Sequence, residues 1–124
     1  MDLIIGGAYQ GKLTYAVKKY GFSEEALFDL SAGFPEEERA CFYHLEALTK
    51  SAAAEGLSPD ETVKSLLPHI KNAVVISREI GCGIVPTDPA ERLWRETHGA
   101  VLKMLAAEAS SVTRVFLGLG EVLK

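Results

Sequence analysis

An apolar run, a glycine-rich turn and a helix-forming segment follow one another at the N-terminus and constrain the fold most strongly. Residues 2–7 read DLIIGG, which is typical of a short buried strand that ends at glycines. Residues 11–21 read GKLTYAVKKYG, in which Lys18 and Lys19 precede Gly21 as a helix C-terminal stop. The glycine turn therefore connects a strand to a helix, an arrangement that favours an α/β fold.

This turn matches all but the last position of the phosphate-binding pattern G-x-x-x-x-G-K-[ST]. Gly6, Gly11 and Lys12 satisfy the pattern, but Leu13 stands where a hydroxyl would help to hold Mg²⁺. In such a loop, backbone N–H groups surround phosphate oxygens and the lysine adds positive charge. We expect a nucleotide site with weakened Mg²⁺ binding; a plain glycine-rich turn is the alternative. The residues expected to bind the nucleotide are Gly6, Gly7, Ala8, Tyr9, Gln10, Gly11, Lys12, Leu13 and Thr14.

The rest of the chain alternates predicted strands and helices. Strands are predicted over residues 26–30, 73–77 and 112–120, and helices over residues 36–55, 58–72 and 88–110. The order β-α-β-α-α-β-loop-α-β predicts a three-layer α/β fold, with a mostly parallel sheet and helices on both faces. We expect residues 1–124 to form a single nucleotide-binding domain.

Local signals place the starts and faces of these helices. Pro35 suits a first helical turn, and the glutamates at 36–38 favour the positive helix N-terminus as a solvated first turn. The capping signatures SPDE and DPAE begin the other two helices, and Pro68 is expected to kink or end the first of these. In the last helix, apolar residues at helical spacing predict one buried face, made of Leu93, Val101, Leu102, Leu105 and Ala109.

Composition excludes several classes of protein. A net charge of −4 with scattered basic residues argues against a protein that binds nucleic acid through its phosphates. Cys41 and Cys82 lie far apart, and the three histidines and two cysteines lack metal-ligand spacing, so we expect no disulfide framework and no structural zinc site. Without a membrane-length apolar stretch or a basic leader, the chain is expected to be soluble and cytoplasmic.

A second constellation lies after the strand predicted over residues 73–77. This strand delivers Arg78 and Glu79 into a loop, at the sheet edge where open α/β folds bind their ligands. Gly81 and Gly83 in that loop allow a close approach of the backbone to a ligand. The alternative is a connection whose glycines and prolines only shape the turn.

Four segments together resemble a known family. GGAYQGKL near the N-terminus is followed, in order, by REIGCGIVP, ERLWRETHG and a final LGLGEVLK. They resemble the adenosylcobinamide kinase / adenosylcobinamide-phosphate guanylyltransferase family. The resemblance implies a P-loop fold, ATP or GTP as the nucleotide, a corrinoid acceptor and a role in cytoplasmic cobalamin biosynthesis. It also implies a homo-oligomer, a trimer with its site near a subunit contact.

The resemblance assigns roles residue by residue. Lys12 would hold phosphates, while Asp29, which matches the family's acidic residue of the Walker B type, or Glu79 would orient the acceptor hydroxyl or help with a metal ion. Lys12, Asp29 and Glu79 are thus the expected catalytic residues. The residues expected to bind the substrate are Glu79, Gly81, Gly83, Pro86, Arg92 and Arg95.

The chain also departs from the family. Leu13 replaces the phosphate-loop serine, and Leu102-Lys103 stands where the family has Asn-Gln. The segment between Lys12 and Asp29 has no room for the histidine that carries GMP covalently in the family. Three hypotheses follow: a cobinamide kinase that lacks the guanylyltransferase step, a non-catalytic nucleotide- or corrinoid-binding protein, and a P-loop protein with an unrelated acceptor.

The histidines and the tryptophan are interpreted mainly as structural. His44 is expected to be a half-packed helix residue, and His69 a surface or capping group. For His98, a position facing the ligand crevice is the less favoured alternative to a structural one. Trp94 occupies a position where the family has phenylalanine and is expected in the core.

Overall fold

The apolar run at the N-terminus forms β1 (Asp2–Gly6), which lies inside a mostly parallel sheet. The computed structural model describes residues 1–80 and 87–124, and its six described strands are ordered β2-β3-β4-β1-β5-β6. Neighbouring strands pair in parallel, except that β5 and β6 pair antiparallel. The other strands are β2 (Leu27–Asp29), β3 (Cys41–Tyr43), β4 (Val74–Arg78), β5 (Ser111–Phe116) and β6 (Leu119–Val122).

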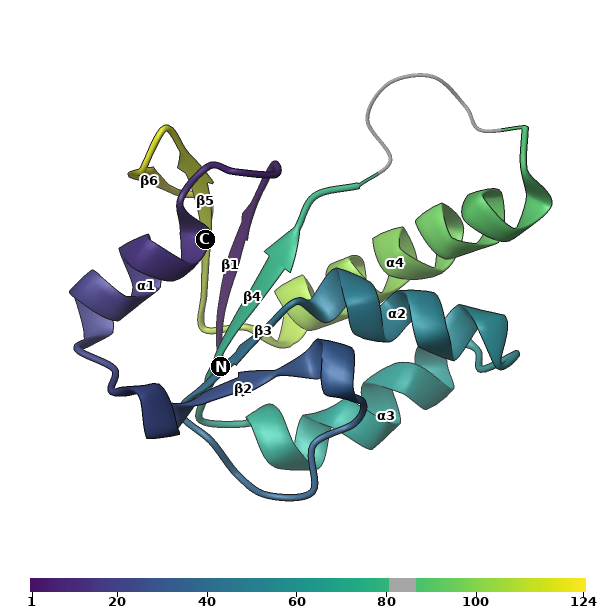
Figure 1. Ribbon diagram of the computed structural model, residues 1–124, viewed down its shortest axis with the longest axis horizontal. Coiled ribbons are helices and arrows are strands. Elements are labelled where there is room, and N and C mark those ends of the chain that lie inside the picture. Colours follow the sequence, from purple (N-terminus) through teal and green to yellow (C-terminus); the bar gives the residue numbers. More distant parts are fainter. Residues whose placement is uncertain (81–86) are drawn as a thin grey trace.

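Helices cover both faces of this sheet, as Figure 1 shows. One face carries α1 (Lys12–Tyr20), and the other carries α2 (Leu45–Ala54), α3 (Pro59–Ile70) and α4 (Pro89–Glu108). Two short 3₁₀ turns, Glu24–Ala26 and Leu30–Ala32, flank β2. The predicted three-layer α/β architecture is therefore confirmed. Among the helices of the described ranges, none is both long and apolar enough to cross a membrane.

The predicted helix boundaries are largely confirmed. The Ser58 side chain accepts a hydrogen bond from the Glu61 N–H, and the Asp88 side chain accepts one from the Ala90 N–H, so both capping signatures begin helices. α1 ends at Gly21. Pro68 does not end α3, which continues through this exposed proline to Ile70.

The helix predicted over residues 36–55 is wrong in its first half. Pro35 and the exposed glutamates at 36–38 are not helical; residues 41–43 form β3, and α2 begins only at Leu45. β3 pairs with both β2 and β4, which buries Cys41 and Phe42 completely. Burial between two strands outweighs the local helix signal of this segment.

The single strand predicted over residues 112–120 is in fact a hairpin. Leu117 and Gly118 both have positive φ, 52° and 76°, and form the tight turn between β5 and β6. The hairpin carries exposed apolar side chains, namely Phe116, Leu117, Leu119 and Val122, with Leu123 just beyond it.

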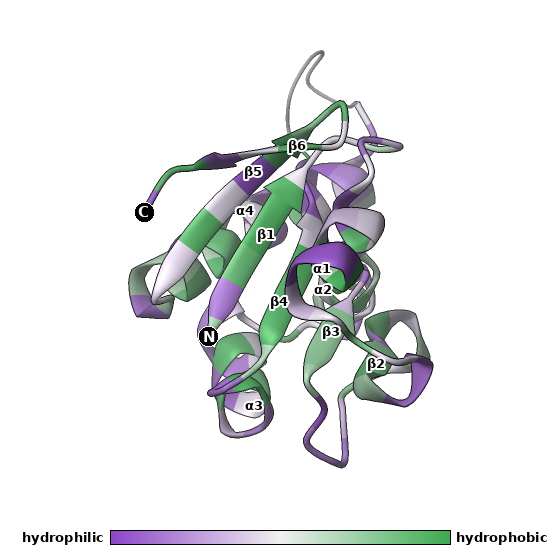
Figure 2. Cartoon of the chain, turned by 90° about the vertical axis from the view of Figure 1, so that its left-hand side faces the viewer, coloured by the Kyte–Doolittle hydropathy of each residue, from purple (hydrophilic) through white to green (hydrophobic). Residues whose placement is uncertain are grey.

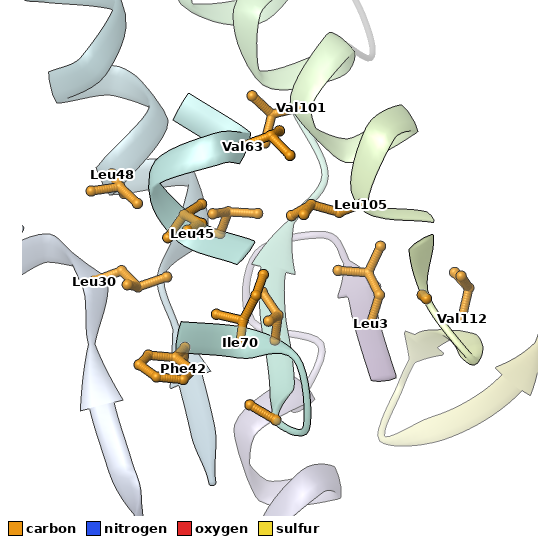
Figure 3. Close-up of a cluster of buried hydrophobic side chains, with 14 residues drawn as sticks. Leu3, Leu30, Phe42, Leu45, Leu48, Val63, Ile70, Val101, Leu105 and Val112 are labelled. Carbon is orange, nitrogen blue, oxygen red and sulfur yellow. The ribbon is translucent and has the colours of Figure 1, made fainter. Parts of the chain in front are cut away.

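Two hydrophobic clusters hold the layers together. Figure 2 shows that β1 and β4 are hydrophobic along most of their length, so both of their faces are covered. On the α1 face, Ile4, Ala16 and Val115 belong to one cluster. The larger cluster lies under α2, α3 and α4 and includes Leu3, Phe42, Leu45, Val101, Leu105 and Val112 (Figure 3).

The apolar face predicted for α4 is only partly correct. Val101, Leu105 and Ala109 are buried, whereas Leu93, in the N-terminal half of the helix, is 49% exposed. Only the C-terminal half of α4 packs against the rest of the fold, so apolar residues near the start of the helix are exposed to solvent.

These two leucines provide a matched test of the core. We expect Leu105→Ala to lower the free energy of unfolding by about 2–5 kcal/mol, because it leaves a cavity in the larger cluster. Leu93→Ala should lower it by less than about 0.5 kcal/mol. Urea unfolding measures both values; equal losses would contradict the packing described for α4.

Candidate functional site

The glycine loop between β1 and α1 has a backbone shape that few residues allow. Gly11 has φ 83° and stands immediately before α1, and Tyr9 also has a positive φ, of 60°, with its side chain in solvent. At the start of the loop, a Cβ on Gly6 would lie 2.5 Å from the Val115 carbonyl oxygen. Glycine at position 6 therefore lets β1 and β5 approach where the loop begins.

Neighbouring strand ends hold the carbonyl groups of this loop. The Gly6 carbonyl accepts the Glu79 N–H at 2.8 Å, and the Gln10 carbonyl accepts the Gly118 N–H at 2.9 Å. The Gln10 side-chain oxygen accepts the Leu117 N–H at 2.8 Å. The N–H groups of Ala8, Tyr9 and Gly11 bond to no acceptor among the described residues, and residues 8–9 form a hydrogen-bonded turn. The loop is thus fixed through its acceptors, while these donors remain available to a ligand.

Lys12 begins α1 and folds back over the loop. Its Nζ donates a hydrogen bond to the Gly7 carbonyl at 2.7 Å, and its stem packs beside Gly6. Partial burial lowers the pKa of the Lys12 amine; the Glu46 and Glu79 carboxylates oppose this effect, and Arg78 adds to it. The ammonium group is therefore held at the loop rather than in bulk solvent.

Lys12 lines a cleft of about 370 Å³ at the carboxyl ends of the parallel strands. Of the loop residues expected to bind nucleotide, six line it: Ala8, Tyr9, Gly11, Lys12, Leu13 and Thr14. The opposite side is formed by residues that sequence reasoning did not place in the nucleotide site: Tyr43, His44, Glu46, Ile76 and Arg78. A polar wall formed by β3, α2 and β4 thus lies opposite the loop.

Leu13 lies in this cleft without offering an oxygen. Its side chain packs against the cluster that contains Ala16 and Ile76. The position that would supply a metal-binding hydroxyl is therefore apolar, does not fit Mg²⁺, and contributes to the core instead. In the described part of the chain, no group of three or more His, Cys, Asp or Glu side chains is arranged to hold a metal ion.

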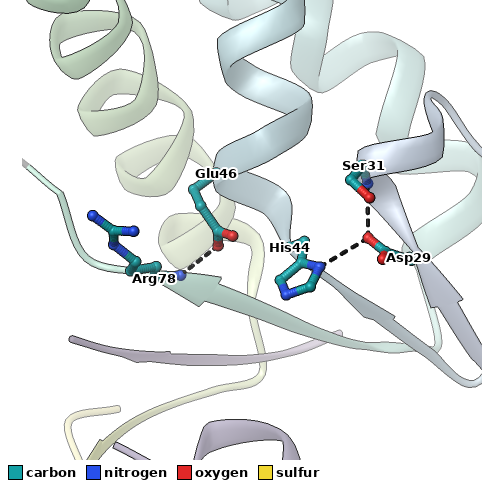
Figure 4. A network of polar contacts seen from close by, with 5 residues as sticks. All are labelled: Asp29, Ser31, His44, Glu46 and Arg78. Atoms are coloured by element: carbon teal, nitrogen blue, oxygen red, sulfur yellow. Dashed lines mark hydrogen bonds and ion pairs between the residues drawn. The ribbon is translucent and has the colours of Figure 1, made fainter. Parts of the chain in front are cut away.

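Three polar contacts organise the wall opposite the loop (Figure 4). His44 Nδ1 lies 2.9 Å from Asp29 Oδ1, and that same oxygen accepts the Ser31 N–H at 2.9 Å. Glu46 Oε1 accepts the Arg78 N–H at 2.8 Å, which ties the start of α2 to the end of β4. The sequence gives no clear local signal for this wall, because the triplet CFY runs directly into the helical pattern of α2.

Asp29 contacts the cleft only through His44. It ends the edge strand β2 and is absent from the lining of the cleft. Burial by itself raises the pKa of the Asp29 carboxyl, but the hydrogen bonds from Ser31 and His44 outweigh this effect, so its pKa lies below the usual value. Asp29 is therefore an ionised partner of His44, and we assign it no metal.

Glu79 lies on the other side of the glycine loop. It lines a smaller hollow with Gly7, Gln10 and Arg114, and its Oε2 lies 3.5 Å from Arg114 Nε. Its carboxylate still favours the charged form of Lys12. Asp29 and Glu79 thus lie on different sides of the glycine loop.

The expected substrate-binding residues are described only in part. Gly81, Gly83 and Pro86 lie outside the described residues. Arg92 and Arg95 lie in the N-terminal half of α4, where Arg92 is exposed and Arg95 is half-buried. The structure places neither arginine in the lining of the Lys12 cleft.

His98 lies behind the polar wall rather than in the cleft. It is completely buried; its Nδ1 lies 2.8 Å from Thr49 Oγ1, and its Nε2 lies 3.0 Å from the Arg78 carbonyl oxygen. Trp94, half-buried and not fully in the core, donates its Nε1–H to the Glu46 carbonyl at 3.0 Å. Both side chains of α4 therefore hold the backbone that presents Glu46 and Arg78.

Comparison with protein families identifies the chain. The model of the family described as cobinamide kinase / cobinamide phosphate guanyltransferase matches residues 43–123 of the 124 residues. The chain belongs to this family. The match begins at the last residue of β3, so it includes His44, Glu46 and Glu79 but not the loop with Lys12. No curated protein matches the chain at a significant level.

The burial of His98 predicts how stability depends on pH. Burial lowers the pKa of His98 below 6.5, whereas the hydrogen bond to the Arg78 carbonyl and the charge of Glu46 act in the opposite direction. The unfolded chain therefore binds more protons as the pH falls from about 7.5 through about 6.5, so the free energy of unfolding should decrease in this range. The lowered pKa values of Asp2 and Asp29 act only in stronger acid.

Urea unfolding at several pH values measures this dependence. We expect His98→Gln to flatten the dependence of stability on pH. His69→Gln changes a half-exposed residue of α3 and should leave this dependence as in the wild type. A wild-type stability that stays constant between about pH 5.5 and 7.5 would contradict the role given to His98.

Proposed function

We propose that this member of the cobinamide kinase / guanyltransferase family binds ATP or GTP at the glycine loop and transfers the γ-phosphoryl group to a hydroxyl of cobinamide. The observation that carries the proposal is the cleft in which Lys12 and the available loop N–H groups face a polar wall. Family membership supports nucleotide-dependent transfer in cobalamin biosynthesis. We place the protein in the cytoplasm.

The loop supplies what phosphate binding requires. Successive N–H groups in a glycine-rich turn, followed by a helix N-terminus, attract phosphate oxygens. The Lys12 ammonium is already within the loop, and moving from the Gly7 carbonyl to a phosphate replaces a neutral acceptor by a charged one. Phosphoryl transfer depends mainly on such positioning and charge stabilisation.

A neighbouring hollow provides space for the nucleoside. It has a volume of about 490 Å³, lies between α1 and the β5–β6 turn, and shares Gly11 and Thr14 with the phosphate cleft. Tyr15, Lys18 and Lys19 of α1 also line it. The two hollows together accommodate phosphates and an attached base on one side of the molecule.

The roles of the other expected residues remain part of the proposal. Glu79 supports the positive charge of Lys12, and Asp29 acts through His44. We place the corrinoid beside the loop that follows β4, with Glu79, Gly81, Gly83, Pro86, Arg92 and Arg95 as its contacts. The exposed apolar side chains of the β5–β6 hairpin support a homo-oligomer, which buries such a surface.

Leu13 supports a second candidate function, that of a binding protein without catalysis. Leucine packs against the core here and has no hydroxyl that could hold Mg²⁺ at the phosphates. Such a protein would still bind nucleotide through Lys12 and the loop. Binding without phosphoryl transfer to cobinamide would favour this second function.

Calorimetric titration with ATP and GTP tests the phosphate site. We expect Lys12→Ala to weaken nucleotide binding by about ten- to a hundredfold, the effect of losing one charge-assisted hydrogen bond. Lys103→Ala, an exposed lysine of α4, is the matched control and should bind as the wild type does. Unchanged affinity of Lys12→Ala would remove the phosphate role; a phosphoryl-transfer assay on adenosylcobinamide then separates the two functions.

A further prediction concerns the guanylyltransferase step. The family's covalent step requires a histidine in a segment that the chain lacks between Lys12 and Asp29. We expect no covalent guanylyl-protein intermediate after incubation with α-labelled GTP, denaturation and intact-mass measurement. An acid-labile GMP adduct on any histidine would contradict this prediction and restore the bifunctional assignment.

A further inference from the structure

We propose that His44, oriented by Asp29, is the general base that accepts the proton of the acceptor hydroxyl during phosphoryl transfer. The inference rests on the proposed function and adds to it a catalytic residue, which the sequence alone led us to interpret as a packed helix residue. It also predicts the acceptor's place, between the phosphate loop and the end of β3.

The backbone places His44 at the cleft. It stands between β3 and α2 with φ 61°, a left-handed conformation that is uncommon for residues other than glycine. Its side chain is 53% exposed and lines the same cleft as Lys12. Histidine here is therefore neither part of a helix interior nor packed away; the chain accepts a strained residue to present it.

The contact with Asp29 determines which ring nitrogen faces the ligand. An ionised carboxylate only accepts hydrogen bonds, so Nδ1, at 2.9 Å from Oδ1, carries the hydrogen. In the neutral ring the lone pair is then on Nε2, which has no hydrogen-bond partner among the described residues. Asp29 thus fixes the tautomer that can accept a proton, and stabilises the imidazolium that results.

The other polar groups around the cleft are less suited to this task. Lys12 and Arg78 are cations without an acceptor. Burial raises the pKa of the Tyr43 phenol, which therefore keeps its proton. Glu46 accepts the Arg78 N–H and balances the charge of Lys12. The titratable or charged groups that face His44 across this cleft and from β2 are Tyr9, Lys12, Asp29, Tyr43, Glu46 and Arg78.

The proposed step is balanced in atoms and charge. The acceptor oxygen forms a bond to the γ-phosphorus as the bond from that phosphorus to the β–γ bridging oxygen breaks. The hydroxyl proton passes to His44 Nε2, and the nucleoside diphosphate leaves with the electron pair of the broken bond. The imidazolium then releases the proton to water, which regenerates the neutral ring.

The test uses the full chain with ATP and adenosylcobinamide. We expect His44→Gln to lower kcat by about 10²–10⁴-fold and to remove the decline of kcat in acid. Asp29→Asn should lower kcat by about tenfold or more, because the ring is no longer held in the tautomer that can accept the proton. His69→Gln is the matched control. ATP affinity, from calorimetry, should stay within about twofold of wild type in all three variants, because none removes a phosphate contact.

The outcomes separate this inference from the proposed function. A His44→Gln variant with wild-type kcat, or with weakened ATP binding as its only defect, overturns the general-base role and leaves the kinase function intact. A phosphorylated His44 detected by intact mass overturns it in favour of a covalent role. A wild-type protein that binds ATP but transfers no phosphate to cobinamide overturns both proposals, and loss of ATP binding in Lys12→Ala identifies the phosphate site independently.

Discussion

The parallel pairing of β1 with both β4 and β5 is the constraint on which the rest of the structure depends. Three neighbouring strands run in the same direction, so their carboxyl ends meet at one edge of the sheet. Gly6 ends β1 opposite Arg78 of β4, and its carbonyl accepts the Glu79 N–H. Backbone pairing alone thereby brings the start of the glycine loop next to the polar residues at the end of β4.

Charges in the cleft are balanced across elements rather than within one. Lys12 comes from α1, Glu46 from α2 and Arg78 from β4. Glu46 and Arg78 both influence the protonation of Lys12. Their positions depend on groups outside the cleft: Glu46 is tied to the Arg78 backbone, which in turn accepts a hydrogen bond from the buried His98. A fixed arrangement of charged groups stabilises a charged transition state without reorganisation at the moment of reaction.

The sequence predicted the layers and the glycine turn between β1 and α1, but not the wall opposite this turn. β1, α1 and β4 carry strong local signals, since an apolar run ends at glycines and a β-branched run is buried on both faces. β3 has only three residues and merges with the periodic pattern of α2, so its pairing with β2 and β4 could not be read locally. His44 was therefore assigned to a helix. The β5–β6 turn was missed because Leu117, unlike glycine, does not signal a positive φ.

The hydrogen bonds between Gln10 and the β5–β6 turn affect how the protein folds during synthesis. The two partners of this contact are 107 residues apart in the chain, and β1 itself pairs only with strands made much later. A ribosome therefore releases the loop sequence early, while the backbone that supports the loop emerges last. Such long-range pairing slows folding, since the chain must close large loops before the contacts form. The glycine loop can therefore adopt its supported shape only at the end of translation, when the C-terminal hairpin has joined the sheet.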